Sequence, residues 1–66
     1  MTLREAREAK GYSQEYLATR VNVTQSAISL WEKGKVPPLR KYHKAICRAL
    51  GVKEHEIEEL CNRRGN

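Results

Sequence analysis

The amino-acid sequence predicts a small all-α domain, on three observations. Apolar residues recur with the helical spacing i, i+3, i+4 and i+7 along several stretches of the 66-residue chain. Short polar residues or prolines precede these stretches and glycine or asparagine tends to follow them, as at helix caps. No stretch alternates apolar and polar residues for long enough to be a half-buried strand. We therefore expect one compact domain over residues 1–66, with five short helices at about residues 2–10, 13–21, 24–33, 39–50 and 53–62.

The first three expected helices begin at residues suited to cap them. Thr2 and Glu5 have the spacing of a capping box, and Ser13 can cap the second helix. Asn22 follows the second helix and tolerates the left-handed backbone of a sharp turn. Thr24 then offers a hydroxyl to the third helix. The second and third helices are therefore predicted to form a helix-turn-helix.

The last two helices are separated from the first three by a proline-containing connector. Pro37 and Pro38 each bias the preceding residue away from helix. The expected helix at 39–50 has apolar or amphipathic residues at 39, 42, 43, 46, 47 and 50, one helical stripe. The expected helix at 53–62 places three apolar side chains on one face: Ile57, Leu60 and Cys61.

The inward faces of these helices supply the expected core. A chain of this length buries only about 60% of its unfolded surface, which leaves no room for a second domain or a large cleft. Ala18 is expected to be the tightest position, because a larger side chain there would separate the second and third helices. The predicted core consists of Leu3, Ala6, Tyr12, Leu17, Ala18, Val21, Val23, Ile28, Trp31, Tyr42, Ile46, Leu50, Val52, Ile57 and Leu60.

The net charge of +5 is unevenly distributed along the chain. Residues 36–53 contain no acidic residue and five basic ones: Arg40, Lys41, Lys44, Arg48 and Lys53. Such a basic block suits a polyanion, although a solvated face is an alternative. No run of apolar residues is long enough to cross a membrane, and residues 1–5 lack the apolar stretch of a signal peptide. We expect a cytoplasmic protein with no membrane contact.

The chemistry-bearing residues do not form a catalytic or metal-binding pattern. Cys47 and Cys61 form no CxxC motif and are expected to be reduced, structural thiols. Metal ligation with His43 or His55, or a redox switch, is the functional alternative, but neither has the usual ligand spacing. No Ser/His/Asp set, paired carboxylates or phosphate loop is present. We expect a protein that is not an enzyme and has no metal, cofactor or small-molecule substrate.

Several motifs, in order and at matching spacing, resemble one known family over about residues 2–60. They are LREAR at 3–7, SQEYLA at 13–18, TQSAISLWEKG at 24–34, Pro38, and residues 45–52. The sequence closely resembles the phage repressor and Cro-like family, the XRE-type helix-turn-helix DNA-binding domains. Asn22 stands where that family usually has glycine. The resemblance implies a compact five-helix, lambda-repressor-like domain whose third helix enters the major groove.

The resemblance also implies which residues read bases. They are Gln25, Ser26 and Ser29, with Leu30 at the margin. Gln25 is the expected leading reader, because its amide has both a donor and an acceptor and can pair with N6 and N7 of adenine. The serines offer weaker bonds, and Leu30 could touch a thymine methyl group or simply pack. An ordinary solvated glutamine is the alternative interpretation of Gln25.

Contacts to the DNA backbone are implied for a second set of residues, namely Gln14, Thr24, Lys33, Lys35, Arg40 and Lys41. By resemblance Gln14 touches a phosphate and braces Gln25, although it and Thr24 could instead only cap their helices. Arg7 and Glu32 are implied to form a structural salt bridge. Trp31 is expected to be a core residue.

The leading hypothesis is a sequence-specific double-stranded DNA-binding transcriptional regulator, and we expect it to be a repressor. One such domain buries roughly 600–1,000 Å² on DNA, which favours a homodimer on a palindromic operator, formed in solution or only on the DNA. The dimer surface is expected on the fifth helix (Ile57, Leu60, Cys61) or on the loop 36–39. The alternative is an antitoxin or anti-regulator that acts mainly through protein–protein contacts. Membrane-surface binding by the basic fourth helix is a weaker alternative.

Overall fold

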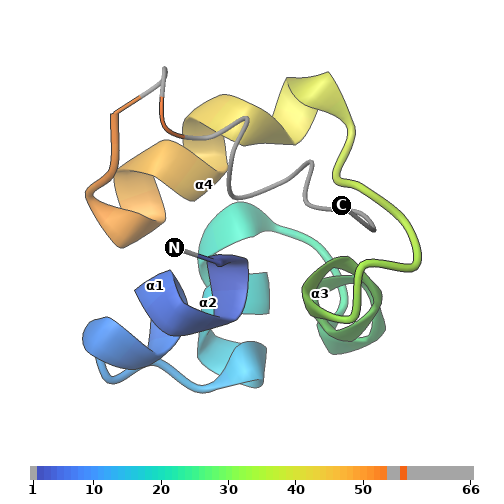
Figure 1. The fold of residues 1–66 in the computed structure, drawn as a ribbon, viewed down its shortest axis with the longest axis horizontal. Helices are drawn as coiled ribbons and strands as arrows, with labels where there is room; N and C mark the ends of the chain where they lie inside the picture. The colour runs from blue at the N-terminus through green and yellow to red at the C-terminus, as the bar shows by residue number, and fades with distance from the viewer. Residues whose placement is uncertain (1, 54–55, 57–66) are drawn as a thin grey trace.

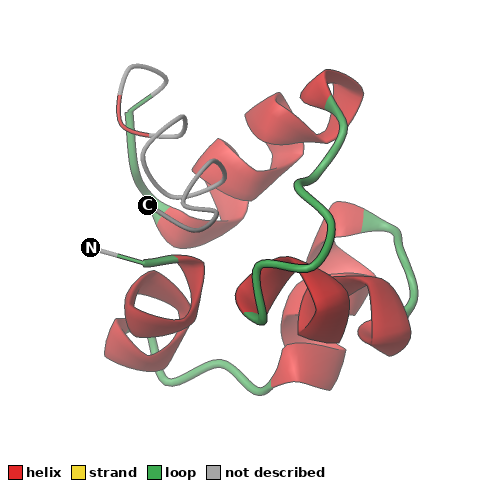
Figure 2. Ribbon diagram, turned by 45° about the vertical axis from the view of Figure 1, so that its right-hand side comes forward, coloured by secondary structure: helices red, strands yellow, loops and turns green. Residues whose placement is uncertain are grey.

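The computed structural model describes residues 2–53 and 56 of the chain. This part contains four α-helices and a short 3-10 helix, and no strand (Figures 1 and 2). They are α1 (Leu3–Ala9), α2 (Gln14–Val21), α3 (Gln25–Glu32), η1 (Arg40–Tyr42) and α4 (His43–Leu50). The all-α prediction is confirmed for these residues. The predicted fifth helix at 53–62, with Ile57, Leu60 and Cys61, lies outside the described residues except at positions 53 and 56.

The helix caps follow the sequence signals. Thr2 Oγ1 accepts a hydrogen bond from the Glu5 backbone N–H at 3.1 Å, and Glu5 Oε1 accepts one from Thr2 N–H at 2.9 Å. Ser13 Oγ accepts from Tyr16 N–H at 3.0 Å, and caps α2. These side chains occupy backbone donors that the first turn of each helix would otherwise leave unpaired. The first three helices therefore begin within a residue of their predicted starts.

The prediction of one continuous α-helix over 39–50 was wrong in its first turn. Residues Arg40–Tyr42 form a 3-10 helix, with Tyr42 N–H bonded to the Leu39 carbonyl at 2.9 Å. Leu39 is extended, with φ −66° and ψ 150°, and gives no side-chain cap. The prolines disfavour helix at Val36 and Pro37, the residues that precede them, and the chain reaches regular α-helix only at His43.

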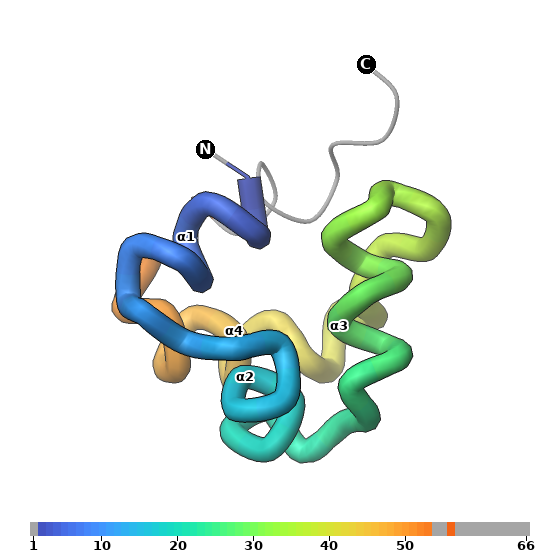
Figure 3. The backbone as a smooth tube through the Cα atoms, turned by 90° about the horizontal axis from the view of Figure 1, so that it is seen from below, coloured from blue at the N-terminus to red at the C-terminus, as the bar shows by residue number. Residues whose placement is uncertain are grey.

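The core lies where α2 packs against both α3 and α4, while α1 packs on α3 (Figure 3). Eight of the predicted core residues are buried: Leu3, Ala6, Leu17, Ala18, Val21, Ile28, Ile46 and Leu50. Five others pack against this core while remaining partly exposed: Tyr12, Val23, Trp31, Tyr42 and Val52. Cys47 and Ala49 are also buried, because they flank Ile46 and Leu50 on the two sides of the inner face of α4. Ala18, 3% exposed, lies on α2, which packs against α3.

No helix in the described part of the chain is both long enough and apolar enough to cross a membrane.

Candidate nucleic-acid interface

The turn between α2 and α3 is fixed by backbone geometry at one residue. Asn22 has φ 68° and ψ 47°, and it is the one non-glycine residue with positive φ in the described part of the chain. The next residue, Val23, donates its N–H to the Ala18 carbonyl at 2.9 Å. Thr24 Oγ1 then accepts from Ala27 N–H at 3.2 Å and starts α3. Asparagine therefore supplies the left-handed turn for which glycine is more usual.

One face of α3 is held in the core and the opposite face is open. Ile28 is fully buried. Gln25 and Ser26 are exposed in the first turn, and Leu30 is 43% exposed. Ser29 is only half-buried, because it lines a small polar hollow together with residues of α1 and α2. The helix thus presents short polar side chains and one amide on its outer surface.

An ion pair joins α1 to the last residue of α3. Arg7 Nε lies 2.6 Å from Glu32 Oε2, and Arg7 Nη2 lies 3.2 Å from Glu32 Oε1. The side chains are 11% and 5% exposed, respectively. A third bond runs from Arg7 Nη1 to the Tyr12 carbonyl at 2.7 Å. The hydrogen bond to Glu32 raises the pKa of Arg7 above its ordinary value despite the opposing effect of burial, so the guanidinium stays charged.

Gln14, the first residue of α2, lies between the two ends of α3. Its Nε2 donates to Glu32 Oε1 at 3.0 Å. Its Oε1 lies 3.5 Å from Gln25 Nε2, at the outer limit of a hydrogen bond. We call the sequence of contacts Arg7–Glu32–Gln14–Gln25 the polar chain. The Arg7–Glu32 and Gln14–Gln25 contacts match those that the family resemblance implies.

Sequence reasoning missed the Gln14–Glu32 bond. The available signal was the spacing of Gln25 and Glu32 at i and i+7, which puts both on one face of α3. The periodicity of one helix, however, does not show that a side chain from α2 reaches both.

The basic residues assigned to the DNA backbone follow α3 along the chain. Lys33, Lys35, Arg40 and Lys41 are all exposed, and none forms an ion pair with a carboxylate in the part of the chain that the structure describes. Lys41 Nζ lies 5.3 Å from the centre of the Tyr42 ring. These exposed charges therefore follow α3 along the chain, and no carboxylate among the described residues pairs with them.

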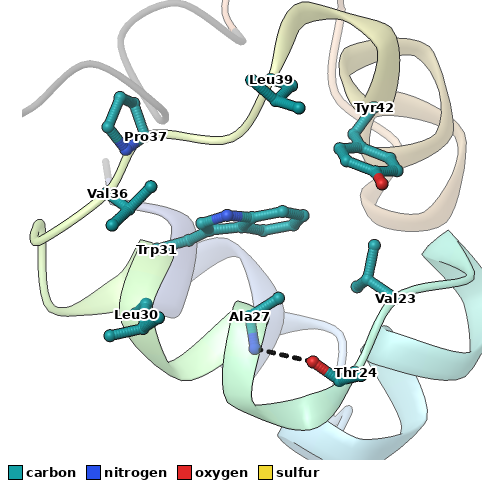
Figure 4. A pocket seen from close by; sticks show the side chains of 9 residues that line it. All are labelled: Val23, Thr24, Ala27, Leu30, Trp31, Val36, Pro37, Leu39 and Tyr42. Atoms are coloured by element: carbon teal, nitrogen blue, oxygen red, sulfur yellow. Dashed lines mark hydrogen bonds between the residues drawn. The ribbon is translucent and has the colours of Figure 1, made fainter.

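An apolar hollow of about 500 Å³ lies on the side of α3 that faces the loop leading to η1 (Figure 4). Figure 4 shows the Trp31 ring in the middle of it, with Val36 and Leu39 approaching from the loop. Leu30, Val36 and Leu39, at 43%, 47% and 61% exposed, are three of the large apolar side chains that remain open to solvent. The lining residues of this apolar hollow are Val23, Thr24, Ala27, Leu30, Trp31, Val36, Pro37, Leu39 and Tyr42.

Comparison with known proteins agrees with this geometry. The model of the helix-turn-helix family matches residues 3–57, most of the chain. The chain belongs to the XRE-type helix-turn-helix family. A helix-turn-helix domain of this kind binds double-stranded DNA and is typically not an enzyme.

One relative of this helix-turn-helix protein comes from Methanothermobacter thermautotrophicus. It is 45% identical over 58 residues, which cover 88% of this chain and 81% of the relative. The relative is described as an uncharacterized HTH-type transcriptional regulator.

Proposed function

We propose that this protein recognises a specific double-stranded DNA sequence and represses transcription in the cytoplasm by occupying that site. The observation that carries the proposal is the exposed amide of Gln25, the first residue of α3, which is held from behind by Gln14. A helix-turn-helix places the N-terminal residues of its second helix against base edges in the major groove. The description of the relative as a transcriptional regulator supports the regulatory part of the proposal.

The base-reading roles follow the exposure of α3. Gln25 is assigned to adenine, and Ser26 to a weaker contact beside it. Leu30, 43% exposed, is suited to a thymine methyl group. Ser29 is the least accessible of the four, so we assign it a marginal role.

Backbone contacts are assigned to helix starts and to the basic residues that follow α3. Thr24 Oγ1 already accepts a hydrogen bond from Ala27, which leaves its hydroxyl hydrogen free to donate to a phosphate. Gln14 lies at the start of α2, where backbone N–H groups also favour an anion. Charge contacts that position the protein without reading sequence are assigned to Lys33, Lys35, Arg40 and Lys41.

We further propose that two copies bind one palindromic operator, because a single small domain buries too little DNA surface for high specificity. Of the two surfaces expected from the sequence, the loop 36–39 has support in the apolar hollow. Leu39 and Val36 are the most exposed of its large apolar residues. A second copy that covers them on adjacent half-sites, about 34 Å apart, would remove this apolar surface from water.

Selection of bound DNA from a random pool tests the proposal. The expected result is a motif with dyad symmetry that contains a preferred adenine in each half. Recovery of no motif would refute sequence-specific binding. A motif without dyad symmetry would refute the dimer but not the reading role of α3.

The apolar hollow also supports a second candidate function, an antitoxin or anti-regulator that acts mainly through another protein. Light scattering of the purified chain on a selected duplex measures how many copies bind, and this number distinguishes a repressor from an antitoxin or anti-regulator. Two copies per palindrome support the repressor. One copy on DNA, together with a small protein that co-purifies and is released by Leu39→Glu, supports the alternative.

A further inference from the structure

We propose that Glu32 is a positioning residue for base recognition: through Gln14 it orients the Gln25 amide so that α3 prefers adenine to guanine. The inference rests on the proposed function, since it requires that Gln25 reads a base. Glu32 itself lies at the opposite end of α3 from Gln25 and is assigned no contact with DNA.

The first step is the fixed polarity of the Glu32 carboxylate. Its side chain is 5% exposed, and Arg7 donates to both of its oxygens. A carboxylate only accepts hydrogen bonds. The group of Gln14 that lies 3.0 Å from Glu32 Oε1 must therefore be the NH₂ end of its amide.

The second step follows from the planarity of the Gln14 amide. With its nitrogen turned toward Glu32, its oxygen faces Gln25, 3.5 Å from Nε2. An amide oxygen only accepts hydrogen bonds, so Gln25 must donate an N–H to it. Gln25 then has its second N–H and its own oxygen left for the groove.

This remaining pair of groups matches one purine. Adenine presents an acceptor at N7 and a donor at N6, which fit the free N–H and oxygen of Gln25. Guanine presents two acceptors, N7 and O6. If the Gln14 amide were reversed, its NH₂ would face Gln25. The Gln25 oxygen would then accept a hydrogen bond from it, and both N–H groups of Gln25 would be left to donate to guanine. The direction of the Gln14 amide therefore selects between the two purines.

The decisive variant is Glu32→Gln, which keeps the shape of the side chain. The new amide can donate as well as accept, so Gln14 is free to reverse. We expect the preference for adenine over guanine at the position read by Gln25 to fall by about tenfold, within the range of a bidentate contact. Binding to a non-specific duplex should stay within about twofold of the original. Fluorescence anisotropy titrations with a selected duplex, and with the same duplex carrying G·C for A·T, measure both.

Arg7→Lys is the matched control. It weakens the same ion pair but leaves the Glu32 carboxylate in place as a pure acceptor. We expect it to lower the melting temperature about as much as Glu32→Gln while the adenine preference remains. Loss of preference in both variants, in proportion to lost stability, would show a merely structural role and overturn the inference.

A double-mutant comparison tests whether Glu32 acts through Gln25. In a Gln25→Ala background, Glu32→Gln should leave the adenine-to-guanine ratio unchanged. If Glu32→Gln does not fold, the pair Arg7→Met and Glu32→Met removes the acceptor without leaving a buried charge, and should lose the preference in the same way.

The outcomes separate this inference from the proposed function. A protein that shows no base preference, and in which Gln25→Ala changes nothing, fails the proposed function. A protein whose adenine preference is lost in Gln25→Ala but retained in Glu32→Gln fails only the positioning role of Glu32.

Discussion

The two flanks of α3 differ in chemistry: the polar groups on one flank are hydrogen-bonded to one another, whereas the apolar groups on the other are open to solvent. On one flank, the polar chain pairs a nearly buried carboxylate with a guanidinium and then with an amide. On the other flank, the apolar hollow leaves Leu39, 61% exposed, in contact with water. Hydrogen bonds whose donors and acceptors are fixed hold a side chain in one orientation. Covering exposed apolar surface with another protein surface, in contrast, lowers the free energy. The polar flank is therefore suited to positioning a reader, and the apolar flank to receiving a partner.

Removing the cation of the polar chain should have the largest effect. Arg7→Ala leaves the buried Glu32 carboxylate without its guanidinium partner. We expect the free energy of unfolding to fall by about 3–5 kcal/mol. Urea denaturation followed by circular dichroism measures it. Arg4→Ala is the control, since the Arg4–Glu8 pair is exposed at 66% and 53% and should contribute under about 0.5 kcal/mol. Equal losses in both variants would contradict the distinction between the two ion pairs.

Truncating Gln25, the proposed base-reading residue, should affect binding and leave the fold intact. Gln25→Ala is expected to weaken binding to the selected site by about 1–3 kcal/mol and to relax one base position in each half-site. The side chain is exposed, so the melting temperature should stay within a degree or two. A repeated selection that returns the original motif would rule out Gln25 as the leading reader.

The loop residue Leu39 on the apolar flank should contribute to assembly alone. Leu39→Ser removes the most exposed apolar side chain of that flank, and we expect the two half-sites to be filled less cooperatively, by about 1 kcal/mol. Affinity for an isolated half-site serves as the control and should not change. A variant that still fills the palindrome in one cooperative step would place the contact between copies elsewhere.

The smallest effect is expected from removing one lysine that is assigned to the DNA backbone. Lys35→Ala should weaken binding to all sequences alike and reduce the slope of log K against log salt by about one. Titrations at several salt concentrations on selected and random duplexes measure this. A change confined to the selected duplex would instead assign Lys35 to base reading.

Local chemistry made much of the fold predictable from sequence. Thr2, Ser13 and Thr24 announce helix starts because their hydroxyls accept from N–H groups within three residues. Asn22 marks the turn because few other residues adopt φ 68° cheaply. Each cap joins groups within three residues, and the Asn22 turn depends on the conformation of a single residue. None of these features therefore depends on how the helices pack.

Features that depend on packing were harder to predict. The 3-10 start at Arg40–Tyr42 depends on how the chain leaves the prolines. The Gln14–Glu32 bond joins residues 18 positions apart, and no pattern within either helix specifies it. The exposure of Val36 and Leu39 likewise follows from the path of a loop over Trp31. The candidate site residues and two of their contacts, Arg7–Glu32 and Gln14–Gln25, came from family resemblance, whereas the Gln14–Glu32 bond that links these two pairs came from the structure.

A single guanidinium ties together three parts of the chain: α1, through Arg7 itself, the carbonyl of Tyr12, and the end of α3 at Glu32. The N-terminal helix is thereby coupled, through Glu32 and Gln14, to the exposed amide of Gln25. Fraying of α1, seen as faster amide hydrogen exchange, would release Glu32 before the core opens. A folded protein in that state would still bind DNA through its exposed lysines but would discriminate less sharply between purines. The fidelity of recognition would then follow the local stability of the first helix.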